Sequence, residues 1–276
     1  MDGLVIADLK GVVASINFTM PMAEKPYSYN YEPPPGVPPR NTREETHRVK
    51  VFDGRAVADR LSLDREGFVL LQRPTAATNL YDDAEVNSLY YAECERVIGE
   101  ATGAARVVAF DHIARNAALS AKGNQIKLPA SRVHNDYTVK SAPQRVRDLM
   151  GEEAEELLKH RFAEVNLWRP IRGPLLRSPL ALCDAQSLVE ENLVASDLRY
   201  PDRTGETYAV TYNPAQRWFY FPKMQADEIV LIRCFDSARS GAARFSAHGA
   251  FDDPDSPPDA PPRESIEVRA LVFFAD

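Results

Sequence analysis

The feature that most constrains this chain is the series of short β-rich runs in its second half. Between residues 163 and 274, segments rich in β-branched and aromatic residues are separated by proline, glycine or aspartate. Such segments are typical of strands joined by turns, and their close spacing favours a sandwich or a barrel. The runs are AEVNLWRP, SPLALCDA, TYAVTYNP, QRWFYFP, DEIVLIRCFDS and SIEVRALVFF.

The first half adds helices to this β-rich region. Apolar residues at spacings of three and four predict an amphipathic helix over residues 83–101, capped by Asp82 or Asp83. A second helix is predicted over residues 143–160. Strands are predicted over residues 47–55, 67–74 and 105–112. We therefore predict one α+β domain over residues 1–276, in which helices from the N-terminal half brace a β-barrel-like sandwich.

A proline- and tyrosine-rich segment over residues 21–48 interrupts the predicted strands. Tyr27, Tyr29 and Tyr31 precede a cluster of prolines, which cannot continue a hydrogen-bonded ladder. The tyrosines predict an extended arm or loop that packs over the domain, and a disordered linker is the alternative. Whether this arm lies over the active site or reaches across a homodimer stays open. The preceding residues, 1–20, are expected to enter the fold as a strand.

The net charge and the cysteine content limit which partners and which cellular compartment we expect for this chain. A net charge of −7 argues against nucleic acid, because polyanions are held chiefly by an excess of lysine and arginine. Charged residues interrupt the apolar N-terminus, so we expect no signal peptide and no membrane span. The three cysteines form no CxxC pair, which favours a reducing, cytoplasmic setting. A small molecule is therefore the expected partner.

Three residues form a candidate metal site. His134 and Asp136 are two residues apart in VHNDYT, so their side chains lie on the same face of an extended segment. This HxD pair alone is a weak signal, but His248 follows in HGAFDDP near the end of the β-rich region. Two imidazoles and one carboxylate are the ligand set of non-haem Fe(II) oxygenases, which keep three coordination positions open. The pattern predicts an Fe(II) site at which these three residues are also the catalytic ones.

A second group of residues suits the cosubstrate 2-oxoglutarate. Arginine binds a carboxylate through two parallel hydrogen bonds, and a serine two residues away projects to the same side of a strand. Arg263 and Ser265 have this spacing. Arg269 has the same parity and is the alternative anchor, in which case Arg263 would lie at the exposed mouth of the strand. We expect these three residues to bind 2-oxoglutarate and leave open which arginine is the anchor.

The surroundings of these motifs resemble the hydroxylase/desaturase family. This family includes proteins similar to the cephem methoxylase small component and the fungal gibberellin desaturase. The similarity extends from about residue 130 to the end, with a weaker match in the N-terminal strands. Five stretches carry the resemblance: VHNDYT, VNLWRPIRGPLLRSPLALCDAQSL, NPAQRWFYFPKMQADEIVLIRCFDS, HGAFDDP and PRESIEVRALVFF.

The resemblance implies a double-stranded β-helix, a jelly-roll or cupin-like core, with a mononuclear Fe(II) centre that uses 2-oxoglutarate and O₂. It implies an oxygenase that hydroxylates, desaturates, cyclises or rearranges a small natural-product intermediate by oxidising an unactivated C–H bond. The alternative is a catalytically silent ligand-binding or partner subunit of a two-component enzyme. Residues near the family stretches are candidates for substrate binding, with structural packing as the other role for the tryptophan: Thr138, Asn166, Trp168 and Tyr220.

Overall fold

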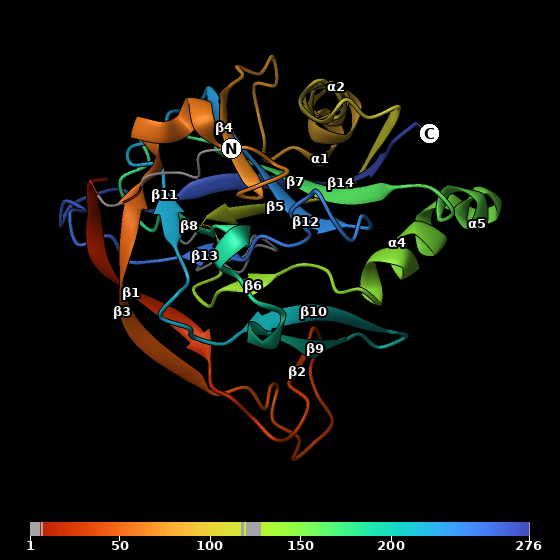
Figure 1. Ribbon diagram of the computed structural model, residues 1–276, viewed down its shortest axis with the longest axis horizontal. Helices are drawn as coiled ribbons and strands as arrows, with labels where there is room; N and C mark the ends of the chain where they lie inside the picture. Colours follow the sequence, from red (N-terminus) through yellow and green to blue (C-terminus); the bar gives the residue numbers. More distant parts are fainter. Residues whose placement is uncertain (1–5, 7, 117–118, 120–127, 276) are drawn as a thin grey trace.

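The computed structural model describes residues 6, 8–116, 119 and 128–275, and these form two facing β-sheets with few helices (Figure 1). Within these residues the first sheet has nine strands and the second has five. The order in the first sheet is β1 (Gly11–Thr19), β3 (Glu44–Asp53), β11 (Trp218–Tyr220), β8 (Leu180–Cys183), β13 (His248–Ala250), β6 (His134–Asn135), β10 (Thr204–Val210), β9 (Leu193–Arg199) and β2 (Tyr27–Tyr29). The order in the second sheet is β4 (Phe68–Gln72), β12 (Glu228–Asp236), β7 (Phe162–Pro170), β14 (Glu264–Phe273) and β5 (Arg106–Asn116).

All six β-rich runs of the second half contribute a strand, as their composition predicts. The strands predicted over residues 47–55, 67–74 and 105–112 also form, as β3, β4 and β5. The N-terminal strand begins at Gly11, and residues 1–5 and 7 lie outside the described residues. Four strands were not predicted from the sequence, β2, β6, β9 and β13, and the first two are only three and two residues long. β9 is only partly buried near the sheet edge, and β13 is three residues long with a central glycine, so neither carries the usual β-rich signature.

The helix predicted over residues 83–101 is continuous but not uniform. It consists of α1 (Asp83–Glu85), a π-helical turn (Val86–Tyr90) and α2 (Tyr91–Thr102). The Asp82 carboxylate accepts a hydrogen bond of 2.9 Å from the Ala84 N–H, as an N-cap should. The apolar stripe of α2 covers the outer face of the second sheet, where it meets side chains of β7, β12 and β14.

The second predicted helix divides in two, α4 (Ser141–Met150) and α5 (Ala154–Leu157), separated by a 3₁₀ turn (Gly151–Glu153). Further 3₁₀ turns cover Gly54–Arg60, Ala185–Ser187 and Glu190–Asn192. Among the described residues, no helix combines the length and apolar character needed to span a membrane.

Large apolar side chains fill the space between the two sheets. Trp168, Leu182 and Phe219 belong to this inner cluster and are almost fully buried. A further cluster lies where the first sheet curls, with Phe18 packed edge-on against Trp218 at 5.7 Å. This curl brings β1 beside the chain that leads into β6. The Asn17 carbonyl accepts a 3.0 Å hydrogen bond from the Val133 N–H there.

The tyrosine-rich arm packs against the first sheet, in agreement with the packing expectation and not with a disordered linker. Its strand β2 pairs in parallel with β9. The rings of Tyr27 and Tyr29 meet edge to face at 5.7 Å, and the Arg199 guanidinium lies 4.1 Å from the Tyr27 ring centroid. Cation–π contact of this kind adds to the backbone pairing.

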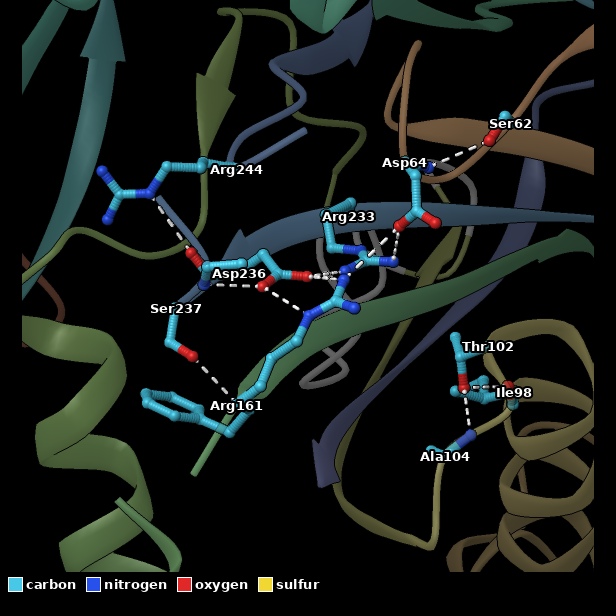
Figure 2. A network of polar contacts seen from close by, with 12 residues as sticks. Ser62, Asp64, Ile98, Thr102, Ala104, Arg161, Arg233, Asp236, Ser237 and Arg244 are labelled. Atoms are coloured by element: carbon cyan, nitrogen blue, oxygen red, sulfur yellow. Dashed lines mark hydrogen bonds and ion pairs between the residues drawn. The ribbon is translucent and has the colours of Figure 1, made fainter. Parts of the chain in front are cut away.

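A network of ion pairs, buried in part, lies at the end of strand β12 (Figure 2). Arg233 on β12 is almost fully buried, and its guanidinium contacts the buried Asp236 carboxylate and, at 3.1 Å, Asp64. Arg161 adds a second guanidinium 2.7 Å from Asp236. Burial lowers the pKa of Arg233 to about 10, which leaves it charged at neutral pH. The carboxylate of Asp236 therefore balances two cations at once.

Replacing Asp236 with alanine leaves Arg233 with only the half-exposed Asp64. Removing one partner of a buried ion pair costs about 3–5 kcal/mol, so we expect the free energy of unfolding to fall by about that amount in urea denaturation. Asp59→Ala, at an exposed position, is the matched control and should change this free energy by less than about 0.5 kcal/mol. Equal effects of the two substitutions would contradict the assignment.

Candidate metal centre

The HxD segment and His248 meet in the first sheet. β6 pairs antiparallel with β13 so that His134 lies directly opposite His248, and opposite residues project to the same face. Their ring centroids are 4.9 Å apart. The Asp136 carboxylate follows and lies 3.5 Å from the His134 Nε2 atom. One ligand atom from each of the three residues lies within 4.8 Å of the others, close enough to share one ion.

The backbone selects the nitrogen that each imidazole offers to a metal. The Nδ1 atom of His134 is 3.0 Å from the Arg132 carbonyl oxygen, and that of His248 is 3.1 Å from the Ser246 carbonyl oxygen. A carbonyl only accepts, so each Nδ1 carries the proton and each Nε2 has a free lone pair. The Nε2 of His248 is buried without a hydrogen-bond partner in the described residues. Burial also lowers the pKa of His248, which favours the neutral ligand form.

The second sheet holds the Asp136 carboxylate. Its Oδ2 atom accepts hydrogen bonds from Asn166 Nδ2 at 2.7 Å and Arg269 Nε at 3.1 Å. Burial alone would raise the pKa of Asp136, but the Arg269 charge and the contact with His134 outweigh it and hold the pKa well below its usual value. Oδ1 faces His134 and is available to a metal. Two neutral imidazoles and an ionised carboxylate therefore fit Fe(II).

Sequence reasoning missed Asn135, the middle residue of the HxD motif. Its side-chain amide donates hydrogen bonds of 2.8 Å to the carbonyl oxygens of Tyr137 and Cys234. The β7–β12 register shifts between Arg233 and Phe235, which leaves the Cys234 carbonyl free for this contact. Asn135 thereby ties the metal-binding segment of the first sheet to the second. The available signal was the side-chain amide of Asn135 between two candidate ligands, because a buried amide must find hydrogen-bond partners.

The two candidate arginines of β14 have different surroundings. Arg269 is bound by three carboxylates: Asp136, Asp111 at 2.9 Å and Glu267 at 3.1 Å. Arg263 is 4% exposed and forms no ion pair with a described residue. Its Nη1 donates to the Ser178 carbonyl oxygen at 2.9 Å, and its Nε has no partner there.

The position of Arg263 corrects the alternative in which it lies at an exposed strand mouth. Burial and the nearby charge of Arg115 lower the pKa of Arg263 to about 9, so it remains a buried cation at neutral pH. The Ser265 hydroxyl is also buried and has no partner among the described residues. An unpaired buried cation beside an unsatisfied hydroxyl is the environment that a ligand carboxylate would complete.

Two of the four candidate substrate residues, Thr138 and Tyr220, contact other parts of the protein. Thr138 caps α4, because its hydroxyl accepts a 3.0 Å hydrogen bond from the Ser141 N–H, and it donates to Glu206 at 2.6 Å. Tyr220 faces the cluster in the curl of the first sheet, away from the inner cluster that contains its neighbour Phe219. The sequence does not show which face of β11 is the inner one.

Asn166 and Trp168 do face the interior, as their shared parity predicts. Asn166 binds Asp136 rather than standing free for a substrate. Trp168 packs in the inner cluster, and the Arg263 guanidinium lies 5.6 Å from its ring centroid. The tryptophan therefore supports the buried arginine while it fills the core.

Two cavities adjoin the centre. Asp136 and Arg269 line one of about 430 Å³ between α4 and the β9–β10 hairpin. Arg269 also lines one of about 700 Å³ that β5 borders. The two cavities share five lining residues: Tyr137, Arg145, Tyr200, Arg203 and Arg269.

Comparisons with known proteins agree with this geometry. The family described as "Oxidoreductase/YMDC permease-like domain" matches residues 16–273. The Fe(II)/2-oxoglutarate-dependent dioxygenase nvfI of Aspergillus novofumigatus is 34% identical over 252 residues, which cover 89% of this chain and 90% of that protein. The chain belongs to the Fe(II)/2-oxoglutarate-dependent hydroxylase/desaturase family.

Other members of the family support the same conclusion. The hydroxylase/desaturase efuI of Hormonema carpetanum is 34% identical over 256 residues, covering 84% of this chain and 85% of that protein. The solved structure of the iron and alpha-ketoglutarate-dependent endoperoxidase NvfI matches with a TM-score of 0.88 and 30% identity, over 96% of this chain and 98% of that one. The family match thus also covers the N-terminal strands from residue 16, where the sequence itself showed a weaker resemblance than it did after residue 130.

The protein is therefore an oxidoreductase that uses Fe(II) and 2-oxoglutarate. These relatives support the enzyme and not the catalytically silent subunit.

Replacing Asn166 with alanine removes one of the two side chains that orient Asp136. Such supporting groups typically contribute 10–100-fold to metal affinity, so we expect Fe(II) binding to weaken by about that factor in anaerobic calorimetry. Asn192→Ala is the matched control, because Asn192 is a buried amide that bonds Thr211. A comparable loss of Fe(II) affinity in the control would show that the effect is not specific to Asp136.

Proposed function

We propose that His134, Asp136 and His248 bind Fe(II) in a double-stranded β-helix core and are the catalytic centre of an oxygenase. The observation that carries this proposal is the free Nε2 of each imidazole beside the oriented Asp136 carboxylate. When bound, the metal would bring 2-oxoglutarate and dioxygen together. Dioxygen would be the oxidant: two of its four oxidising equivalents are used to convert 2-oxoglutarate into succinate and carbon dioxide, and the other two are left for an unactivated C–H bond of the substrate. The substrate is a small natural-product intermediate, in keeping with a relative named aspirochlorine biosynthesis protein N, of Aspergillus oryzae.

We propose further that Arg263 anchors the far carboxylate of 2-oxoglutarate and that Ser265 donates a hydrogen bond to it. Arg263 is a buried cation without a carboxylate partner in the described residues, and the Ser265 hydroxyl is unsatisfied there. Arg269 already forms ion pairs with three carboxylates, and these contacts support a different role for it. It orients the metal ligand Asp136 and keeps it ionised.

The chain's own residues perform three tasks in this proposal. Asn166 and Arg269 fix the carboxylate of Asp136, so that its free oxygen is available to the metal. Trp168 and the inner cluster exclude water from the interior, which protects a reactive centre from side reactions. The adjoining cavities give the substrate access to the centre, and their lining determines which carbon lies next to it.

An anaerobic titration with Fe(II) and then 2-oxoglutarate tests both proposals, because the chelate gives a weak visible charge-transfer band. We expect the band in the wild type and its loss in His134→Ala. Arg263→Met should weaken 2-oxoglutarate affinity about 100-fold, since it removes a buried charged hydrogen-bond partner. Ser265→Ala should weaken it about tenfold.

The matched control is Arg172→Met, an exposed arginine that pairs with Glu264 at 3.2 Å, and it should leave 2-oxoglutarate affinity unchanged. Fe(II) affinity, measured separately, should be unchanged in all three of these variants. Unaltered 2-oxoglutarate affinity in Arg263→Met would transfer the anchor role to Arg269. Absence of both metal affinity and the band in the wild type would refute the proposed centre.

A further inference from the structure

The wall shared by the two cavities carries two arginines from different elements. Arg145 comes from α4, and Arg203 comes from the turn between β9 and β10. In Figure 1, α4 and the tip of this hairpin lie on the same side of the molecule. Arg269, which binds the Asp136 carboxylate, lines both cavities together with these two arginines.

Most acidic side chains that line the cavities contact a basic side chain. Lys25, Arg269 and His112 are the basic partners. The acidic residues they contact are Asp83, Asp111, Asp136, Asp197 and Glu206. The remaining acid, Asp148, accepts a 2.8 Å hydrogen bond from Gln144 and forms no ion pair with a described residue. Lys25 thus pairs with two of these carboxylates and Arg269 with two others, whereas Asp83 meets only a histidine.

Arg145 and Arg203, by contrast, have no charged partner of this kind in the region that the structure describes. Neither Arg145 nor Arg203 forms an ion pair within the described part of the chain. Each guanidinium lies over an aromatic ring, Arg145 at 5.6 Å from the Phe110 centroid and Arg203 at 4.1 Å from that of Tyr200. Stacking holds a guanidinium plane in place and leaves its N–H edges free for a carboxylate or similar oxyanion. The Nε atom of Arg145 is buried without a hydrogen-bond partner among the described residues.

Glu164 on β7 is the buried acid whose charge would act on Arg145. Neither of its carboxylate oxygens has a hydrogen-bond partner in the described residues, and it forms no ion pair there. Burial raises the pKa of Glu164 well above its usual range despite the opposing charge of Arg145. This direction disfavours the charged form of Glu164, and Glu164 forms no ion pair with Arg145 in the described part of the chain.

The lining also includes aromatic and aliphatic side chains among its polar ones, and these could contact an apolar part of a ligand. Tyr137 and Tyr200 line both cavities, and Phe110 and Leu149 line the larger one. Ligand sites typically combine such an apolar lining with a few charged groups that fix orientation.

We infer that Arg145 and Arg203 form an anion subsite, and that the substrate is an apolar molecule bearing an oxyanion such as a carboxylate. The subsite would fix the charged end of the substrate while the apolar body extends toward the metal centre. This inference rests on the proposed function, because it takes the metal centre as the place of reaction.

Two fluorescent probes with the same aromatic skeleton test the subsite on the full-length protein. 8-Anilinonaphthalene-1-sulfonate carries an anionic group, and N-phenyl-1-naphthylamine lacks it. We expect Arg145→Met and Arg203→Met each to weaken sulfonate-probe binding about tenfold, as expected for a lost charged hydrogen bond. Binding of the neutral probe should be unchanged.

Arg147→Met is the matched control, because Arg147 lies on the same helix but pairs with Glu155 at 2.6 Å. It removes the same charge and should leave both probes unaffected. Unchanged sulfonate-probe affinity in the Arg145 and Arg203 variants, or an equal loss in the control or for the neutral probe, would overturn the subsite.

The Fe(II) and 2-oxoglutarate titration, repeated on the same variants, separates the two proposals. An unaltered charge-transfer band with weakened sulfonate-probe binding supports a subsite for the substrate. Weakened 2-oxoglutarate affinity in these variants would assign the arginines to the cosubstrate and overturn the inference. A wild type that shows no band, yet binds the sulfonate probe through both arginines, would refute the proposed function alone.

Discussion

The contact between Asp136 and Arg269 joins the two sheets at the metal centre. Asp136 follows the short strand β6 of the first sheet, while Arg269 and Asn166 face each other on neighbouring strands of the second. The same hydrogen bonds that hold the sheets together orient the carboxylate and keep it charged. A metal ligand that depended only on its own two-residue strand would have no comparable support, because so short a strand has few ladder bonds.

Two arginines on one strand illustrate how surroundings decide a role. Arg263 and Arg269 have the same parity and both face the interior, yet one has no carboxylate partner in the described residues and the other has three. A buried guanidinium is costly unless an anion balances it. For Arg269 the protein supplies the anions. For Arg263 the described residues supply none, which is why we propose a ligand carboxylate there. This difference could not be read from the spacing of the two residues.

Local patterns in the sequence predicted more of this molecule than did relations between strands. Residue spacing predicted the helix that begins after Asp82 and the pairing of His134 with Asp136, because both depend on neighbours in the chain. It did not predict that Tyr220 faces away from the inner cluster, or that Thr138 caps a helix and binds Glu206. Those facts depend on how the first sheet curls and on which distant strands meet. The part played by Asn135 was missed for the same reason, since its partner Cys234 is far along the chain.

The centre and its surroundings are built from elements of different rigidity. The residues proposed to bind metal and cosubstrate lie on or beside paired strands, where backbone ladders fix each side chain within the interior. Arg203 instead lies in a hairpin turn, and Arg145 lies on α4, whose Ala142 and Val146 pack into the inner cluster. Turns tolerate sequence change better than paired strands do. A change at Arg203 would therefore alter the proposed anion subsite without disturbing the proposed metal ligands. Such a separation is consistent with one family containing hydroxylases, desaturases and an endoperoxidase.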